Sequence, residues 1–159
     1  MQNTMSGSLH HLWLYTDWAN TLLLETLRGY SDAVPSICLR LLSHIMNAQV
    51  IWLSRINGVP SPVSVWTEHD LTTCEHYHRT ASEELGQIVK AYVPEQNQLI
   101  DYKDSKNVAY QNSLQDILLH IFNHGSYHRA QIAMEMRRNG LEPINTDYLI
   151  FARNRERSV

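Results

Sequence analysis

Four long segments in which apolar residues recur at alternating spacings of three and four dominate the chain. This spacing places the apolar side chains along one face of an α-helix. The segments cover about residues 8–28, 35–57, 70–92 and 113–139. Glycine and proline are scarce, with 6 and 5 residues among 159, which disfavours the many turns of an all-β fold. Four amphipathic helices of this length are typical of a four-helix bundle, so we expect an all-α fold.

The ends and connections of these segments complete the expected architecture. Residues typical of helix ends flank them, namely Ser8, Asp70 and Ser113 at the N-termini and Gly29 and Gly140 at the C-termini. Residues 97–113 alternate weakly around Lys-Asp-Ser-Lys, which predicts a short β-hairpin between the third and fourth helices. The tail DYLIFARNR predicts a last short helix covering one end of the bundle. No repeat or biased linker divides the chain, so we expect one domain over residues 1–159.

The charge balance disfavours nucleic acid as a partner. Thirteen Lys and Arg residues against sixteen Asp and Glu give a net charge of −3, whereas nucleic-acid-binding domains usually carry a basic patch. We interpret an Arg-rich C-terminal region as favourable charge at a helix C-terminus followed by a solvated tail. Its members are Arg137, Arg138, Arg153, Arg155 and Arg157.

The sequence also indicates a cytoplasmic protein that does not enter membranes. The N-terminal segment MQNTMSGSLHHLWLY has no Lys or Arg and no long apolar stretch, so no signal peptide is expected. No run approaches the roughly 18 apolar residues that cross a bilayer. The two cysteines, Cys38 and Cys74, form no CxxC pair, which is typical of a reducing compartment.

Two of the nine histidines form a candidate metal-binding pair. His124 and His128 are four residues apart, so both rings lie on one face of the predicted helix. That face also carries Ile121 and Ile132, and both rings should therefore point into the bundle, where burial is costly unless they are hydrogen-bonded or coordinated. The spacing is that of the HExxH helix of zinc proteases, but the glutamate that acts as the base there is missing.

A third ligand is less certain from spacing alone. His44 lies beside the apolar face of residues 35–57 and is a candidate, although its position alone favours a lone core histidine bonded to a backbone carbonyl. His120 could replace His128, support a ligand ring or belong to the bundle wall. His78 is interpreted as a hydrogen-bonded core histidine. The remaining histidines are interpreted as surface or capping residues: His10, His11, His69 and His76.

Several strings, in the same order, resemble the DinB/YfiT-like family of bacterial metal-binding four-helix bundles. They are WAN at 18–20, LLSHIMNAQVIWLSRINGVP at 41–60, LLHIFNHGSYHRAQI at 118–132 and DYLIFAR at 147–153. The resemblance implies an up-down-down-up bundle with a long crossover, which often pairs as a homodimer. It also implies that His44, His124 and His128 bind a divalent metal ion. Nitrogen ligands suit several ions, and we expect zinc or nickel, with iron as an alternative.

Two positions depart from the family pattern. Ala130 stands where relatives usually have glycine, which crowds a helix contact without touching a ligand. Gln49 stands where many relatives have an acidic residue, so a carboxylate base is not expected there.

Three imidazoles leave an open position on a tetrahedral ion, where water or a thiol becomes acidic. Characterised relatives include transferases that use bacillithiol or mycothiol, so the resemblance implies a thiol-dependent S-transferase acting on small electrophiles in stress response or detoxification. The alternatives are a metal-dependent hydrolase and a non-catalytic metal-binding dimer induced by stress. The family's association with DNA-damage induction concerns expression and does not imply DNA binding.

Other polar and aromatic residues near the motifs have predicted roles around the candidate site. Arg129 is predicted to form a salt bridge between helices, with the gripping of an anionic substrate as the alternative. Trp66, in the loop after the second segment, either lines a pocket or caps the core. Four residues are candidate partners for the ligand rings, although ordinary contacts between helices are favoured: Asn47, Gln49, Tyr127 and Glu135.

Overall fold

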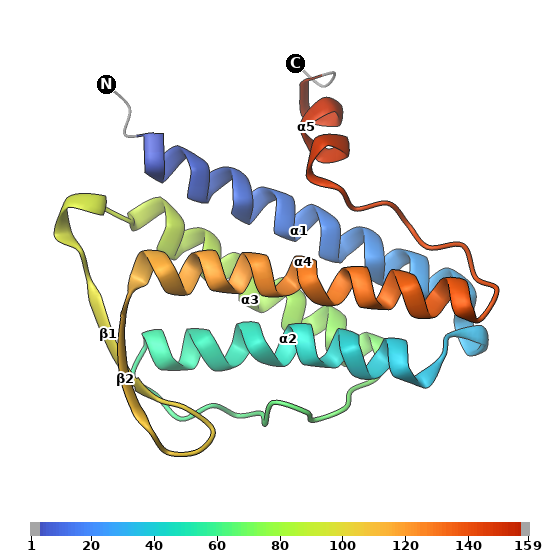
Figure 1. Ribbon diagram of the computed structural model, residues 1–159, viewed down its shortest axis with the longest axis horizontal. Coiled ribbons are helices and arrows are strands. Elements are labelled where there is room, and N and C mark those ends of the chain that lie inside the picture. Colours follow the sequence, from blue (N-terminus) through green and yellow to red (C-terminus); the bar gives the residue numbers. More distant parts are fainter. Residues whose placement is uncertain (1–3, 157–159) are drawn as a thin grey trace.

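The computed structural model describes residues 4–156 and shows a helical bundle with one small hairpin (Figure 1). The helices are α1 (Thr4–Tyr30), α2 (Ser36–Ile56), α3 (Leu71–Ala91), α4 (Leu114–Arg138) and α5 (Tyr148–Glu156). The strands are β1 (Leu99–Lys103) and β2 (Ala109–Ser113), and two short 3₁₀ turns cover Ser31–Ala33 and Pro94–Gln96. The expected all-α fold with a hairpin between the third and fourth helices is confirmed.

The bundle has the up-down-down-up topology that the resemblance implies. In Figure 1, α1 and α4 run in one direction, and α2 and α3 run in the other. Because α2 and α3 are parallel, residues 57–70 must return along the whole length of α2, and this segment is the long crossover. Helix α2 packs against both α3 and α4, while α1 packs against the opposite sides of the same two helices.

The helix ends follow their predicted caps in most places. The Asp70 carboxylate accepts a hydrogen bond from the Thr73 amide at 2.7 Å, and Ser113 Oγ accepts one from the Asp116 amide at 3.1 Å. Gly140 adopts a φ of +73° just after α4, as a helix-terminating glycine does. The prediction for Ser8 was wrong, because α1 begins at Thr4 and Ser8 lies inside it. Apolar periodicity marks the part of a helix that packs on the core, and Gly7 and Ser8 are exposed.

Gly29, predicted to end the first helix, also lies inside it, since α1 continues to Tyr30.

The predicted last helix is present as α5, and it packs on α1. Phe151 of α5 forms a small buried cluster with Tyr15 and Ala19, and the Tyr15 hydroxyl donates a hydrogen bond to the Thr146 carbonyl at 2.8 Å.

Among the described helices, α2 alone is long and apolar enough to cross a membrane. Half of its most apolar stretch is buried inside the bundle, against α3 and α4. Leu42, Ile45 and Met46 are fully or almost fully buried there. The apolar composition of α2 is therefore that of a core helix.

The hairpin packs at the end of the bundle where α2 finishes. β1 pairs with β2 in antiparallel register, with Leu99 opposite Ser113 and Lys103 opposite Ala109. The ring of Tyr102, on β1, meets the ring of Trp52, on α2, edge to face at 4.9 Å between centroids. The hairpin thus forms a wall beside the last turns of α2.

Candidate metal centre

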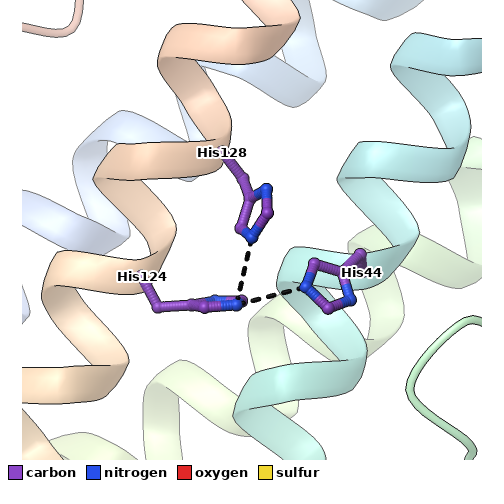
Figure 2. A group of neighbouring side chains, drawn as sticks. All are labelled: His44, His124 and His128. Carbon is purple, nitrogen blue, oxygen red and sulfur yellow. Dashed lines mark hydrogen bonds between the residues drawn. The ribbon is translucent and has the colours of Figure 1, made fainter.

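Three histidine side chains from α2 and α4 meet between the two helices (Figure 2). His44 comes from α2, and His124 and His128 come from consecutive turns of α4. The Nε2 atom of His124 lies 3.2 Å from Nε2 of His44 and 3.1 Å from Nε2 of His128. The three candidate ligand atoms all lie within 4.8 Å of one another. The structure therefore brings together the three histidines that the sequence singles out.

Two of the three rings have their orientation set by a hydrogen bond on the far side. His44 Nδ1 lies 3.1 Å from the Val65 carbonyl, which can only accept, so Nδ1 carries the proton. His128 Nδ1 lies 2.7 Å from Oε1 of Gln131 and donates to it in the same way. Each ring then presents the lone pair of Nε2 to the cluster, which is the arrangement that metal-binding histidines require.

Burial favours the neutral form of two of the three rings. Burial, together with the neighbouring His128 and His44, lowers the pKa of His124 to about 3. Burial also lowers the pKa of His44. Nitrogen lone pairs this close together repel unless a proton or a cation lies between them. The Nε2 proton of a neutral His124 can take that place, and a divalent cation would replace it. Three imidazoles with converging Nε2 atoms fit the donor set of a divalent transition-metal ion.

The crossover covers the cluster. The Trp66 ring stacks on the His44 ring with centroids 4.0 Å apart and planes 11° from parallel. Asn47 holds this part of the crossover, because its Nδ2 donates to the carbonyls of Val65 and Thr67 at 3.3 and 2.7 Å. Its Oδ1 lies 2.8 Å from Nε2 of His69. Trp66 thus caps a ligand ring, while Asn47 supports that ring indirectly by positioning the carbonyl it bonds.

His120 and His78 lie outside the group of three. His120 is exposed on α4, and its ring centroid is 5.5 Å from that of His124 and 5.3 Å from that of Trp52. His78 is buried on α3, where its Nε2 lies 3.1 Å from Oγ1 of Thr21 on α1. That hydrogen bond agrees with the interpretation of His78 as a bonded core histidine.

The salt bridge predicted for Arg129 was wrong. Arg129 is buried, and its guanidinium donates to Oδ1 of Asn20 at 2.9 Å and to Oγ of Ser126 at 2.9 Å. The guanidinium also lies 5.2 Å from the centre of the Tyr15 ring. In the described part of the chain no carboxylate pairs with it, because α1 presents an amide and an aromatic ring at that level. Arg129 therefore joins α4 to α1.

The remaining candidates for holding the ligand rings have other roles. Glu135 pairs with Arg138 at 2.7 Å, and Gln49 is buried with no hydrogen-bond partner at its Oε1. Tyr127 is 62% exposed and touches the His128 ring edge-on. Sequence reasoning missed Gln131, although its spacing of three residues from His128 places it on the same helix face.

The low pKa values predict that the metal-free protein loses stability in mild acid. Burial lowers the pKa of His44, His78 and His124 in the folded state, and partial loss of hydration together with the Arg55 charge lowers that of His120. In the unfolded chain all four titrate near the ordinary value of about 6.5. Below that pH the unfolded chain binds more protons, so the free energy of unfolding falls as pH decreases. Urea unfolding in the presence of EDTA should give a lower midpoint at pH 5 than at pH 7.5.

The matched control for this pH effect is His124→Gln, which removes one of the four groups. Its urea midpoint should depend less steeply on pH than that of the wild type. Equal slopes for the two proteins would contradict the lowered pKa of His124.

Comparison with known proteins agrees with this architecture. The family model described as "DinB family" matches residues 5–158. A search of curated proteins found no match. The matched region includes all four long helices, the crossover, the hairpin and the three clustered histidines. Since the match covers nearly the whole chain, this protein belongs to the DinB family.

Proposed function

We propose that this protein binds one divalent metal ion through His44, His124 and His128 and uses it as a thiol-dependent S-transferase. The observation that carries the proposal is the convergence of three histidine ligand atoms within 4.8 Å of one another. Zinc or nickel is the proposed ion, with iron as the alternative, because all three accept imidazole ligands. The family resemblance supports transfer to small electrophiles, in stress response or detoxification.

A divalent ion with one open position lowers the pKa of a thiol or a water molecule that occupies it. A bound thiol leads to S-transfer and a bound water molecule to hydrolysis, and the protein's own residues decide which of these two reactions is favoured. Hydrolysis of a carbonyl substrate also needs a general base that transfers protons during attack by the water molecule. In the described chain no carboxylate forms a hydrogen bond or ion pair with the three histidine rings. S-transfer needs only a thiolate held beside an electrophile, so this site favours transfer over the hydrolase alternative.

The roles of the surrounding residues follow from their contacts. Val65 and Gln131 hold two rings in the tautomer that exposes Nε2. Trp66 covers one side of the cluster, and its own side chain remains 51% exposed. In the transfer, the sulfur forms a bond to an electrophilic carbon, the leaving group departs with its electron pair, and the thiol proton passes to solvent.

The test is conjugation of a thiol with 1-chloro-2,4-dinitrobenzene, followed by absorbance, with bacillithiol, mycothiol and glutathione tried in turn. Metal-loaded wild type should accelerate conjugation above the uncatalysed rate with at least one thiol, and His124→Ala should not. Wild type treated with EDTA should behave like the variant. Full metal loading without acceleration by any of the thiols would support the non-catalytic metal-binding dimer instead.

We also propose a cytoplasmic homodimer that binds neither membranes nor nucleic acid. Leu149 and Tyr148 of α5 are 61% and 40% exposed, and apolar side chains gathered on a surface helix are typical of contact surfaces. Two members of the Arg-rich region have partners within the fold. Arg138 pairs with Glu135, and the Arg155 guanidinium lies 5.9 Å from the Phe151 ring centre.

A further inference from the structure

A pocket of about 520 Å³ lies next to the candidate metal centre, between the last turns of α2, the crossover and the hairpin. Val65 lines this pocket and also supplies the carbonyl that orients His44, so the pocket and the cluster share a wall. Ile51, also in the lining, lies seven residues after His44 on the same face of α2. That spacing corresponds to roughly 10 Å along the helix axis.

Arg55 stands at the side of this pocket, held by two aromatic rings. Its guanidinium carbon lies 4.6 Å from the centre of the Trp52 ring and 5.0 Å from that of Tyr102. Both contacts are within the range of cation–π attraction, which fixes the guanidinium without neutralising its charge. In the described chain the Arg55 guanidinium makes no ion pair and no hydrogen bond, so its N–H donors are available to a ligand.

Among the described residues, no negative charge around the pocket pairs with the positive charge of Arg55. Lys103 adds a second positive charge to the lining. Asp101, the acidic residue there, accepts a hydrogen bond from Nε2 of Gln111 at 2.8 Å and does not pair with Arg55. A cation near a helix C-terminus is stabilised by the helix dipole, which explains a positive residue at this position. The dipole does not explain why the guanidinium is clamped between two rings beside an open pocket.

Arg40 provides a contrast on the same helix. It lies before His44, and its guanidinium is 5.2 Å from the Trp66 ring centre, so it too is close to the cluster. Its Nε is 3.9 Å from a carboxylate oxygen of Glu68, however, so a carboxylate already lies beside it. Of these two arginines on α2, Arg55 is the one whose donors have no acceptor.

We propose that Arg55 binds the carboxylate of a thiol ligand whose sulfur lies at the histidine cluster. This inference rests on the proposed function and adds the class of thiol, one that carries a carboxylate at its far end. A guanidinium matches a carboxylate with two parallel N–H···O hydrogen bonds. Eleven residues separate His44 from Arg55, roughly 16 Å of helix rise, and the Arg55 side chain leans back toward His44 as helical side chains do. The ligand is therefore an extended molecule.

The test compares two probes of equal length, 8-mercaptooctanoic acid and 8-mercapto-1-octanol, on the cobalt(II)-loaded protein. Dissociation constants come from the thiolate-to-cobalt charge-transfer absorption, which does not depend on any enzymatic activity. Wild type should bind the acid about tenfold more tightly than the alcohol, as a charge-assisted hydrogen-bond pair provides. Arg55→Gln should bind both probes with the affinity of the alcohol. Arg40→Gln, the matched control, should keep the preference of the wild type.

The outcomes separate this inference from the proposed function. Cobalt content should be equal in the three proteins, and circular dichroism should show the same helix content. If wild type binds both probes equally well, or if Arg55→Gln keeps the preference for the acid, the role of Arg55 is overturned while the thiol site stands. If wild type binds no cobalt, or shows no charge-transfer band with either probe, the proposed function is overturned and the role of Arg55 with it.

Discussion

Replacement of His124 by alanine is expected to abolish metal binding and to leave the bundle folded. His124 is the central member of the cluster, with its Nε2 within 3.2 Å of both other Nε2 atoms. Without it two imidazoles remain, too few for a tetrahedral protein site. Metal content should fall from about one equivalent per chain to less than about 0.1. Plasma mass spectrometry on untagged protein measures this directly, because a polyhistidine tag would itself bind nickel.

The fold should survive because the core is built from other residues. The two main core clusters are aliphatic and aromatic, and a chain of this length buries enough surface to fold without an ion. Circular dichroism and the urea midpoint of the metal-free proteins test this. An unfolded variant would show that the His124 ring is part of the core and would contradict the expectation.

His120→Ala is the matched control for this experiment. It removes an imidazole one turn earlier on α4, from a ring that lies 5.5 Å from His124 but outside the group of three. Metal content should remain that of the wild type, whereas His44→Ala and His128→Ala should lose the ion as His124→Ala does. Loss of the ion in His120→Ala, or its retention in His44→Ala, would show that the ligand set is different.

The same substitution, glycine to alanine, is expected to have opposite effects at two positions. A Cβ atom on Gly86 of α3 would lie 2.5 Å from Cζ2 of Trp13, far inside contact distance. The indole cannot move freely, because its Nε1 donates to the Ser82 carbonyl at 2.8 Å. Overpacking of this kind typically costs about 1–3 kcal/mol. For a domain of this size, Gly86→Ala should lower the melting temperature by roughly 2–10 °C.

Gly29→Ala is the control, because a Cβ there meets no atom within 4 Å. Gly29 is an exposed residue in the last turn of α1, where alanine favours the helix by about 0.5–1 kcal/mol. Its melting temperature should equal or exceed that of the wild type. Differential scanning calorimetry on the two variants checks both signs, and stabilisation by Gly86→Ala would mean that α1 and α3 are not packed as closely as described.

The helices and their order could be predicted from the sequence because each helix buries one continuous apolar face. Asp70 and Ser113 marked two helix starts correctly, since a capping side chain bonds a backbone amide only three residues away. The start of α1 could not be placed in this way. Gly7 and Ser8 are exposed, and the apolar periodicity begins only at the buried Leu9, where the helix meets the core.

The metal centre was predictable to different degrees for its different parts. His124 and His128 share a helix face by spacing alone, whereas the nearness of His44 depends on how α2 packs against α4, which a single sequence does not reveal. The Val65 carbonyl left no signal, because every residue carries such a group. Arg129 was misjudged for a related reason, since its partners Asn20 and Tyr15 lie on a helix more than a hundred residues away in sequence.

The parallel arrangement of α2 and α3 has a consequence for how proteins of this architecture can diversify. Two parallel neighbours require a connection as long as the helices themselves. Here Trp66 of that connection stacks on the ring of His44 in the histidine cluster. The ligands stand on two rigid helices, while the crossover and the hairpin supply much of the pocket wall. Much of the pocket wall therefore lies on segments that supply none of the three histidines, although Arg55 of α2 also borders the pocket. Residues of the crossover can be exchanged to admit new molecules without disturbing the helices that carry the ligands.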